Sequence, residues 1–86
     1  MDNVIDFLQF RQLLQSLENS NTAIRLRMMG EPWMDFSLVV ILSEHAMLLQ
    51  SNGQRKLISN LRSVVEFEID KTVGDYAANR VYSIAC

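Results

Sequence analysis

The sequence predicts one α+β domain, in which an N-terminal helix is followed by a five- to six-stranded antiparallel meander. Apolar residues recur at helical spacing over residues 2–18, whereas from residue 22 onward short apolar segments alternate with charged residues at the two-residue period of a half-buried strand. The pair Asn52-Gly53 is typical of a tight hairpin turn. We therefore expect a single domain over residues 1–86, with the helix at about 2–18 and the antiparallel sheet at about 22–85.

The expected helix is amphipathic, and no Gly or Pro interrupts it. Asp2 or Asn3 can cap its N-terminus, and Asn19-Ser20-Asn21 is expected to end it. Four residues at helical spacing define one apolar stripe: Phe7, Phe10, Leu14 and Leu17. Three further apolar residues are expected on a different side of the same helix: Val4, Ile5 and Leu8. The first half of the helix is then apolar over more of its circumference than one sheet can cover.

The first expected strand has one apolar and one basic face, because Ile24, Leu26 and Met28 alternate with Arg25 and Arg27. Gly30 and Pro32 break this strand. The next one is a short apolar run, rich in β-branched residues, from Phe36 to Leu42. Its length favours a strand that is buried on both faces. One face would meet the interior of the sheet, and the other needs a helix or a second chain to cover it.

The later strands are short and joined by turns. Residues 43–45 form an expected turn before a strand at 46–50, and residues 56–58 return from the Asn52-Gly53 hairpin. Val65, Phe67 and Ile69 then alternate with Glu66, Glu68 and Asp70, as in an amphipathic strand. Residues 71–79 are expected to form a loop and residues 80–85 a last strand.

The order of these elements resembles that of the Sm-like and other SH3-like small barrels, which also place an N-terminal helix before bent strands. The resemblance covers most of the chain and implies a strongly bent sheet or a small barrel. The turn at Asn60-Leu61-Arg62 is loosely similar to the turn of the second Sm motif, but it lacks that motif's Gly. A likeness of fold does not carry a function with it.

Composition excludes several classes of protein. Eight basic and ten acidic residues give a net charge of −2, which argues against a duplex-binding protein with a concentrated basic face. Cys86 has no second cysteine to pair with, so a reducing compartment is the simplest interpretation. The first residues lack the pattern of a signal peptide, and no apolar run approaches membrane-spanning length. We expect a cytoplasmic location and no membrane contact.

No residues predict catalysis, a cofactor or a metal. Ser43, Glu44 and His45 are consecutive, whereas the members of a hydrolase triad must converge through space. The acidic stripe Glu66, Glu68 and Asp70 lies along one strand and does not converge on one ion. If that strand neighbours the one with Arg25 and Arg27, the opposite charges are expected to pair across the strands. We therefore expect a protein that is not an enzyme.

Spare apolar surface is the main functional signal, since 49% of the residues are hydrophobic in a chain of only 86. The first hypothesis is a non-enzymatic binding or assembly module that self-associates or takes a protein partner. The candidate interface residues are Val4, Ile5, Leu8, Trp33, Val39 and Ile41. The alternative is intramolecular, because the helix could cover the outer face of the central strand by itself.

Two other functions stay open. An Sm-like oligomer that binds RNA would use five candidate anion or RNA contacts: Arg25, Arg27, Arg55, Lys56 and Arg62. The acidic balance and the lack of a ladder of base-stacking aromatic residues argue against it. An antitoxin- or immunity-type inhibitor would suit a short acidic chain that blocks a basic protein. No residue selects this third class.

Overall fold

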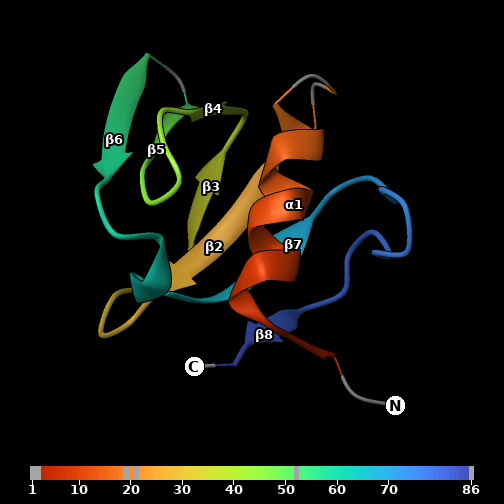
Figure 1. The fold of residues 1–86 in the computed structure, drawn as a ribbon. Coiled ribbons are helices and arrows are strands. Elements are labelled where there is room, and N and C mark those ends of the chain that lie inside the picture. The colour runs from red at the N-terminus through yellow and green to blue at the C-terminus, as the bar shows by residue number, and fades with distance from the viewer. Residues whose placement is uncertain (1–2, 19, 21, 52, 86) are drawn as a thin grey trace.

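A computed structural model describes residues 3–18, 20, 22–51 and 53–85 of the chain (Figure 1). The elements follow one another in the order β1 (Val4–Ile5), α1 (Phe7–Leu17), β2 (Ile24–Met28), β3 (Met34–Phe36), β4 (Leu38–Ile41), β5 (Met47–Ser51), β6 (Gln54–Ile58), the 3₁₀ helix η1 (Leu61–Ser63), β7 (Val64–Ile69) and β8 (Tyr82–Ile84). The α+β class is confirmed.

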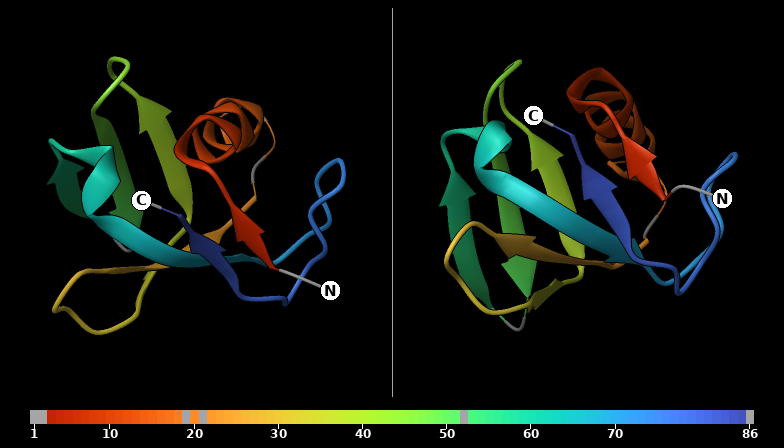
Figure 2. Two further views of the ribbon diagram at one scale, coloured as in Figure 1. Left: turned by 60° about the horizontal axis from the view of Figure 1, so that its bottom comes forward. Right: turned by 90° about the horizontal axis from the view of Figure 1, so that it is seen from below.

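The strands form two sheets. The order is β1-β8-β7-β2-β3 in the five-stranded sheet and β4-β5-β6 in the three-stranded sheet. Only Ser37 separates β3 from β4, so the chain passes directly from one sheet into the other (Figure 2). Of the two expected shapes, a strongly bent sheet or a small barrel, a closed barrel is not found, because the described residues form two separate sheets. The simple meander is wrong, since β7 pairs with β2 and β1 lies parallel to β8.

The helix begins later than the sequence predicted. Val4 and Ile5 are extended and pair with Ser83 and Ile84 of β8. Asp6 caps α1: its Oδ1 accepts a hydrogen bond from Gln9 N (2.8 Å), and Gln9 Oε1 accepts one from Asp6 N (2.9 Å). This reciprocal capping box fixes the first turn and leaves the preceding residues free to extend. The caps expected at 2–3 are replaced by Asp6, and Asp2, Asn19 and Asn21 lie outside the described residues.

We expect Asp6→Ala to lower the free energy of unfolding by about 1 kcal/mol, because it removes the side chain that satisfies an otherwise unpaired backbone N–H. Gln15→Ala, at an exposed position of the same helix, is the matched control and should change it by no more than a few tenths of a kcal/mol. Urea denaturation followed by circular dichroism measures both. Equal stability of Asp6→Ala and the unmutated chain would contradict the capping role.

The core lies between α1 and the inner faces of the two sheets. The buried face of α1 consists of Phe10, Leu13, Leu14 and Leu17, which confirms most of the predicted stripe. The Phe67 ring of β7 lies 5.2 Å from that of Phe10 and 5.4 Å from that of Tyr82, centroid to centroid. At the other end of the helix, Glu18 Oε2 accepts a hydrogen bond from Ile41 N (2.6 Å). The helix therefore covers the β4 edge of the three-stranded sheet, and β6 is left as its open edge.

Candidate interaction surface

The three-stranded sheet has one face in the core and one face toward solvent. Val39, Met47, Leu49 and Ile58 are 0–3% exposed and form the inner face, together with the partly buried Ile41. Side chains alternate across a strand, so the residues between these positions point outward. The register places Val40, Leu48 and Leu57 side by side in one outer row, and Leu38, Gln50 and Arg55 in the next.

Most of this outer side is apolar, and its two polar residues lie in one row near the β5–β6 hairpin. Leu57 is 59% exposed, Leu38 is 38% exposed, and Val40 and Leu48 are half-buried between their neighbours. Leu42 is 55% exposed and continues the alternation of β4, and its N–H donates to the Ala46 carbonyl (3.1 Å). We define the outer apolar face as Leu38, Val40, Leu42, Leu48 and Leu57. None of the five is among the described residues that pack against the core.

The two ends of the outer apolar face carry opposite charges. Arg55 is exposed at the end nearest the β5–β6 hairpin, and it is the one charged residue among the six outward-facing residues of the three strands. Glu44 is exposed in the turn between β4 and β5, beyond Leu42 at the other end. The middle of the face is therefore uncharged, and its long axis has a basic end and an acidic end.

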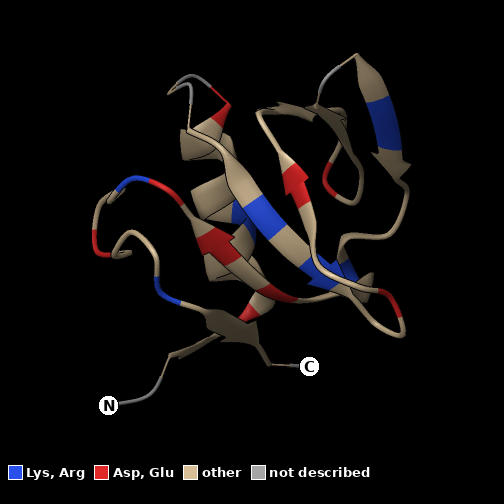
Figure 3. Cartoon of the chain, turned by 180° about the vertical axis from the view of Figure 1, so that it is seen from behind, with Lys and Arg blue, Asp and Glu red and all other residues tan. Residues whose placement is uncertain are grey.

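The outer side of the five-stranded sheet has the opposite character, because acidic and basic residues pair across its strands. Figure 3 marks the positions of these residues along the chain. Arg27 Nε bonds to Glu66 Oε1 (2.6 Å), and Arg25 Nε bonds to Asp35 Oδ1 (2.7 Å). The Arg25 guanidinium also lies 3.6 Å from Glu68 Oε1. The hydrogen bond to Asp35, followed by the Asp35 charge, raises the pKa of Arg25 above its ordinary value. β2 and β7 are neighbours, so the condition for pairing of the opposite charges across these strands is met.

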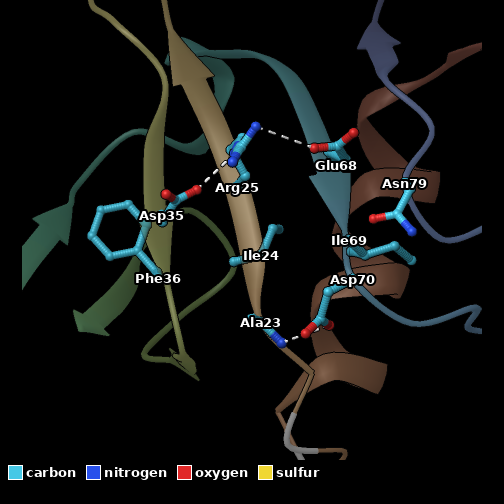
Figure 4. A pocket seen from close by; sticks show the side chains of 9 residues that line it. All are labelled: Ala23, Ile24, Arg25, Asp35, Phe36, Glu68, Ile69, Asp70 and Asn79. Atoms are coloured by element: carbon cyan, nitrogen blue, oxygen red, sulfur yellow. Dashed lines mark hydrogen bonds and ion pairs between the residues drawn. The ribbon is translucent and has the colours of Figure 1, made fainter. Parts of the chain in front are cut away.

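A small cavity of about 190 Å³ opens on this charged side (Figure 4). Arg25, Asp35, Glu68 and Asp70 line it, and Asp70 Oδ1 accepts a hydrogen bond from Ala23 N (3.1 Å). Three carboxylates surround one guanidinium that is already paired with two of them. The electrostatics of this cavity therefore disfavour an anion.

The candidate interface residues do not form one surface. Ile5 and Val39 are 8% and 1% exposed, so they belong to the core, and Ile41 packs against it. The outward-facing residues of β4 are Leu38 and Val40, one position away from the predicted Val39 and Ile41. Val4 and Leu8 are 56% and 57% exposed, but Val4 lies on β1 beside β8 and Leu8 on α1. Trp33 is 39% exposed in the β2–β3 loop.

The candidate anion or RNA contacts are also dispersed. Arg25 and Arg27 are paired with acids on β2, and Lys56 Nζ lies 3.7 Å from Glu31 Oε1. Arg55 and Lys56 are consecutive on β6 and therefore point to opposite faces. Arg62 belongs to η1, and its Cζ lies 4.1 Å from the centroid of the Phe7 ring.

The turn at 43–45 has a structural role, because the Ser43 hydroxyl accepts a hydrogen bond from the His45 backbone N–H (3.3 Å). No group of three or more His, Cys, Asp or Glu side chains in the described residues is arranged to hold a metal ion, and Cys86 lies outside those residues. Within the same part of the chain, no helix has the length and apolar character needed to cross a membrane.

Comparisons with protein-family models, with curated proteins and with solved structures found no match to this chain.

Proposed function

We propose that the chain is a non-enzymatic assembly module that self-associates through the outer apolar face. The observation that carries the proposal is the contrast between the two sheets. Antiparallel sheets that face water usually present polar residues on that side, as the five-stranded sheet does with its arginines and acids. The three-stranded sheet instead presents Leu38, Val40, Leu42, Leu48 and Leu57. Contiguous apolar surface of this kind marks an association site.

Packing of two such faces follows the geometry of sheet-on-sheet cores. Two sheets pack face to face about 10 Å apart, with their inner side chains interdigitated. A leucine that moves from water into such a layer contributes about 1.5–3 kcal/mol. Three strands, each offering two or three outward residues, give a modest contact of the class below about 1,200 Å² in total, so we expect a reversible dimer that responds to dilution.

The charges at the ends favour a second copy as the occupant. A two-fold axis that lies between the faces and runs across the strands places the Glu44 end of one copy over the Arg55 end of the other. The same surface is then complementary to itself, as an isologous interface requires. Edge-to-edge pairing is less favoured, because Arg55 and Lys56 put two positive charges on the open β6 strand.

The two alternative functions receive less support. An RNA-binding oligomer would need its cations to be free and to converge, whereas Arg25 and Arg27 are neutralised by neighbouring acids. An inhibitor of a basic protein would need an acidic contact surface, whereas the middle of the outer apolar face is uncharged.

Charge reversal at the two ends of the outer apolar face tests self-association, because two variants with opposite reversals should restore the ion pairs when they are mixed. Glu44→Lys and Arg55→Glu should each weaken the dimer about 2- to 10-fold, because each removes two exposed ion pairs per dimer and replaces them with repulsion. An equimolar mixture of the two variants restores both pairs, so the heterodimer should be tighter than either homodimer. Molar mass from light scattering over a dilution series measures all three samples. Variants that each match the unmutated chain, with no gain on mixing, would contradict the proposed two-fold arrangement.

A further inference from the structure

A groove of about 460 Å³ lies where α1, the turn between β4 and β5, and η1 meet. Its walls include Phe7, Leu8 and Arg11 of α1, His45 of the turn and Arg62 of η1. The walls hold one another in place, because Leu61 N donates a hydrogen bond to the His45 carbonyl (3.0 Å). Asn60 Oδ1 caps η1 by accepting a bond from Arg62 N (3.1 Å). The groove is thus built from three segments that are distant in sequence, and a hydrogen bond joins two of them, the turn and η1.

Two arginines face this groove without an acidic partner among the described ion pairs. Among the described residues, the basic side chains that form ion pairs are those of Arg25, Arg27 and Lys56. Arg62 stacks over one side of the Phe7 ring, at 4.1 Å from its centroid. Arg11 follows Phe7 by four residues and so lies on the same face of α1, one turn further along. Both arginines therefore line the same groove as the Phe7 ring.

The acid in the groove has a role in the helix cap. Asp6 lines the wall, but its Oδ1 accepts the hydrogen bond from Gln9 N that starts α1. Beside the two arginines, Leu8 leaves 57% of its surface exposed. The groove thus combines two planar, charged donors with an apolar floor. A guanidinium recognises carboxylate and phosphate oxygens through paired N–H donors, and these are stronger than neutral hydrogen bonds.

We propose that this groove binds a small oxyanion, a carboxylate or a phosphate monoester, that carries a short apolar group. The oxyanion accepts hydrogen bonds from Arg11 and Arg62, and the apolar group covers Leu8. The site uses no residue of the outer apolar face. A result that rules out oxyanion binding would therefore leave self-association untouched, and a result that rules out self-association would leave oxyanion binding untouched.

Four probes separate the anion from its apolar group: acetate, hexanoate, inorganic phosphate and hexyl phosphate. Amide chemical shifts of the full chain, followed by NMR during each titration, should move in a saturable way at Leu8, Arg11 and Arg62. The probe with a hexyl or pentyl chain should bind about tenfold more tightly than the bare anion of the same class, because it also buries methylene groups. Comparing the two tailed probes tells whether the site prefers carboxylate or phosphate.

Matched glutamine variants decide whether the groove or general charge is responsible. Arg11→Gln should weaken binding about tenfold, because it removes one charge-assisted contact, whereas Arg80→Gln, at an exposed position before β8, should leave it unchanged. Arg62→Gln should weaken it to a similar extent, with a thermal melt to verify that the fold is kept. If the melt shows that Arg62→Gln is destabilised, Arg11→Gln alone tests the groove, because it leaves the contact between Arg62 and Phe7 in place. No saturable shift at Leu8, Arg11 and Arg62, or equal losses for Arg11→Gln and Arg80→Gln, would overturn the proposal.

Discussion

Leu57→Lys is expected to weaken self-association at least about tenfold, whereas Leu8→Lys should leave it unchanged. The two leucines have almost the same exposure, 59% and 57%, so neither substitution opens a cavity in the core. They differ in location, because Leu57 is in the outer row with Val40 and Leu48, and Leu8 is on α1. A lysine at 57 would have to lose its hydration against an apolar partner surface, which costs more than the lost leucine contact.

Sedimentation equilibrium of the two variants beside the unmutated chain gives the three dissociation constants. Circular dichroism verifies that each variant keeps its fold, as expected for substitutions at exposed positions. Weakening by Leu8→Lys and not by Leu57→Lys would move the interface to the helix, where the sequence had suggested it. Equal weakening by both would attribute the effect to net charge instead of location.

Phe67→Ala is expected to lower the free energy of unfolding by about 3–5 kcal/mol, because it leaves a cavity at the centre of the core. Phe67 is fully buried, and its ring lies between those of Phe10 and Tyr82. Domains typically have only about 5–15 kcal/mol of stability, so this variant should be largely unfolded at moderate temperature.

Val65→Ala, a half-buried position on the same strand, is the control and should lose about 1 kcal/mol or less. Urea denaturation at a concentration at which the protein is monomeric separates folding from association. A loss for Phe67→Ala as small as that for Val65→Ala would show that the contacts among the three aromatic rings add little to stability.

Local patterns in the sequence were sufficient to assign side chains to the faces of a strand where apolar and charged residues alternate cleanly. Arg25 and Arg27 were assigned to one face of a strand, and Glu66 and Glu68 to one face of another, and the register pairs Arg25 with Glu68 and Arg27 with Glu66. The helical stripe was also predicted correctly because it depends only on spacing along α1. Both cases rest on side-chain periodicity alone, which does not require knowledge of the tertiary fold.

The faces of β4 could not be assigned in that way, because residues 38–42 are all apolar and show no alternation. Pairing with β5 decides which side meets the core, and a shift of one residue exchanges the two faces. That is why Val39 and Ile41 were expected at an interface, whereas Leu38, Val40 and Leu42 are the residues on the outer side.

Two members of the outer apolar face could have been found from the sequence. Counting outward from the Asn52-Gly53 turn pairs residue 51 with 54, and therefore Leu48 with Leu57, as the register shows. The parallel pairing of β1 with β8 had no such signal, since it joins residues far apart in the sequence. The start of α1 could have been predicted from the sequence, because Asp6 and Gln9 have the spacing of a capping box.

The dependence of amide chemical shifts on concentration, measured by NMR on the unmutated chain, tests the central claim most directly. As the protein is diluted, we predict shift changes at Leu38, Val40, Leu48 and Leu57 and at both charged ends of the face, Glu44 and Arg55. The amide shifts of residues on the charged side of the five-stranded sheet should not change on dilution. Changes centred on Val4 and Leu8, or no changes together with a molar mass of 9.9 kDa at every concentration, would contradict self-association through the outer apolar face.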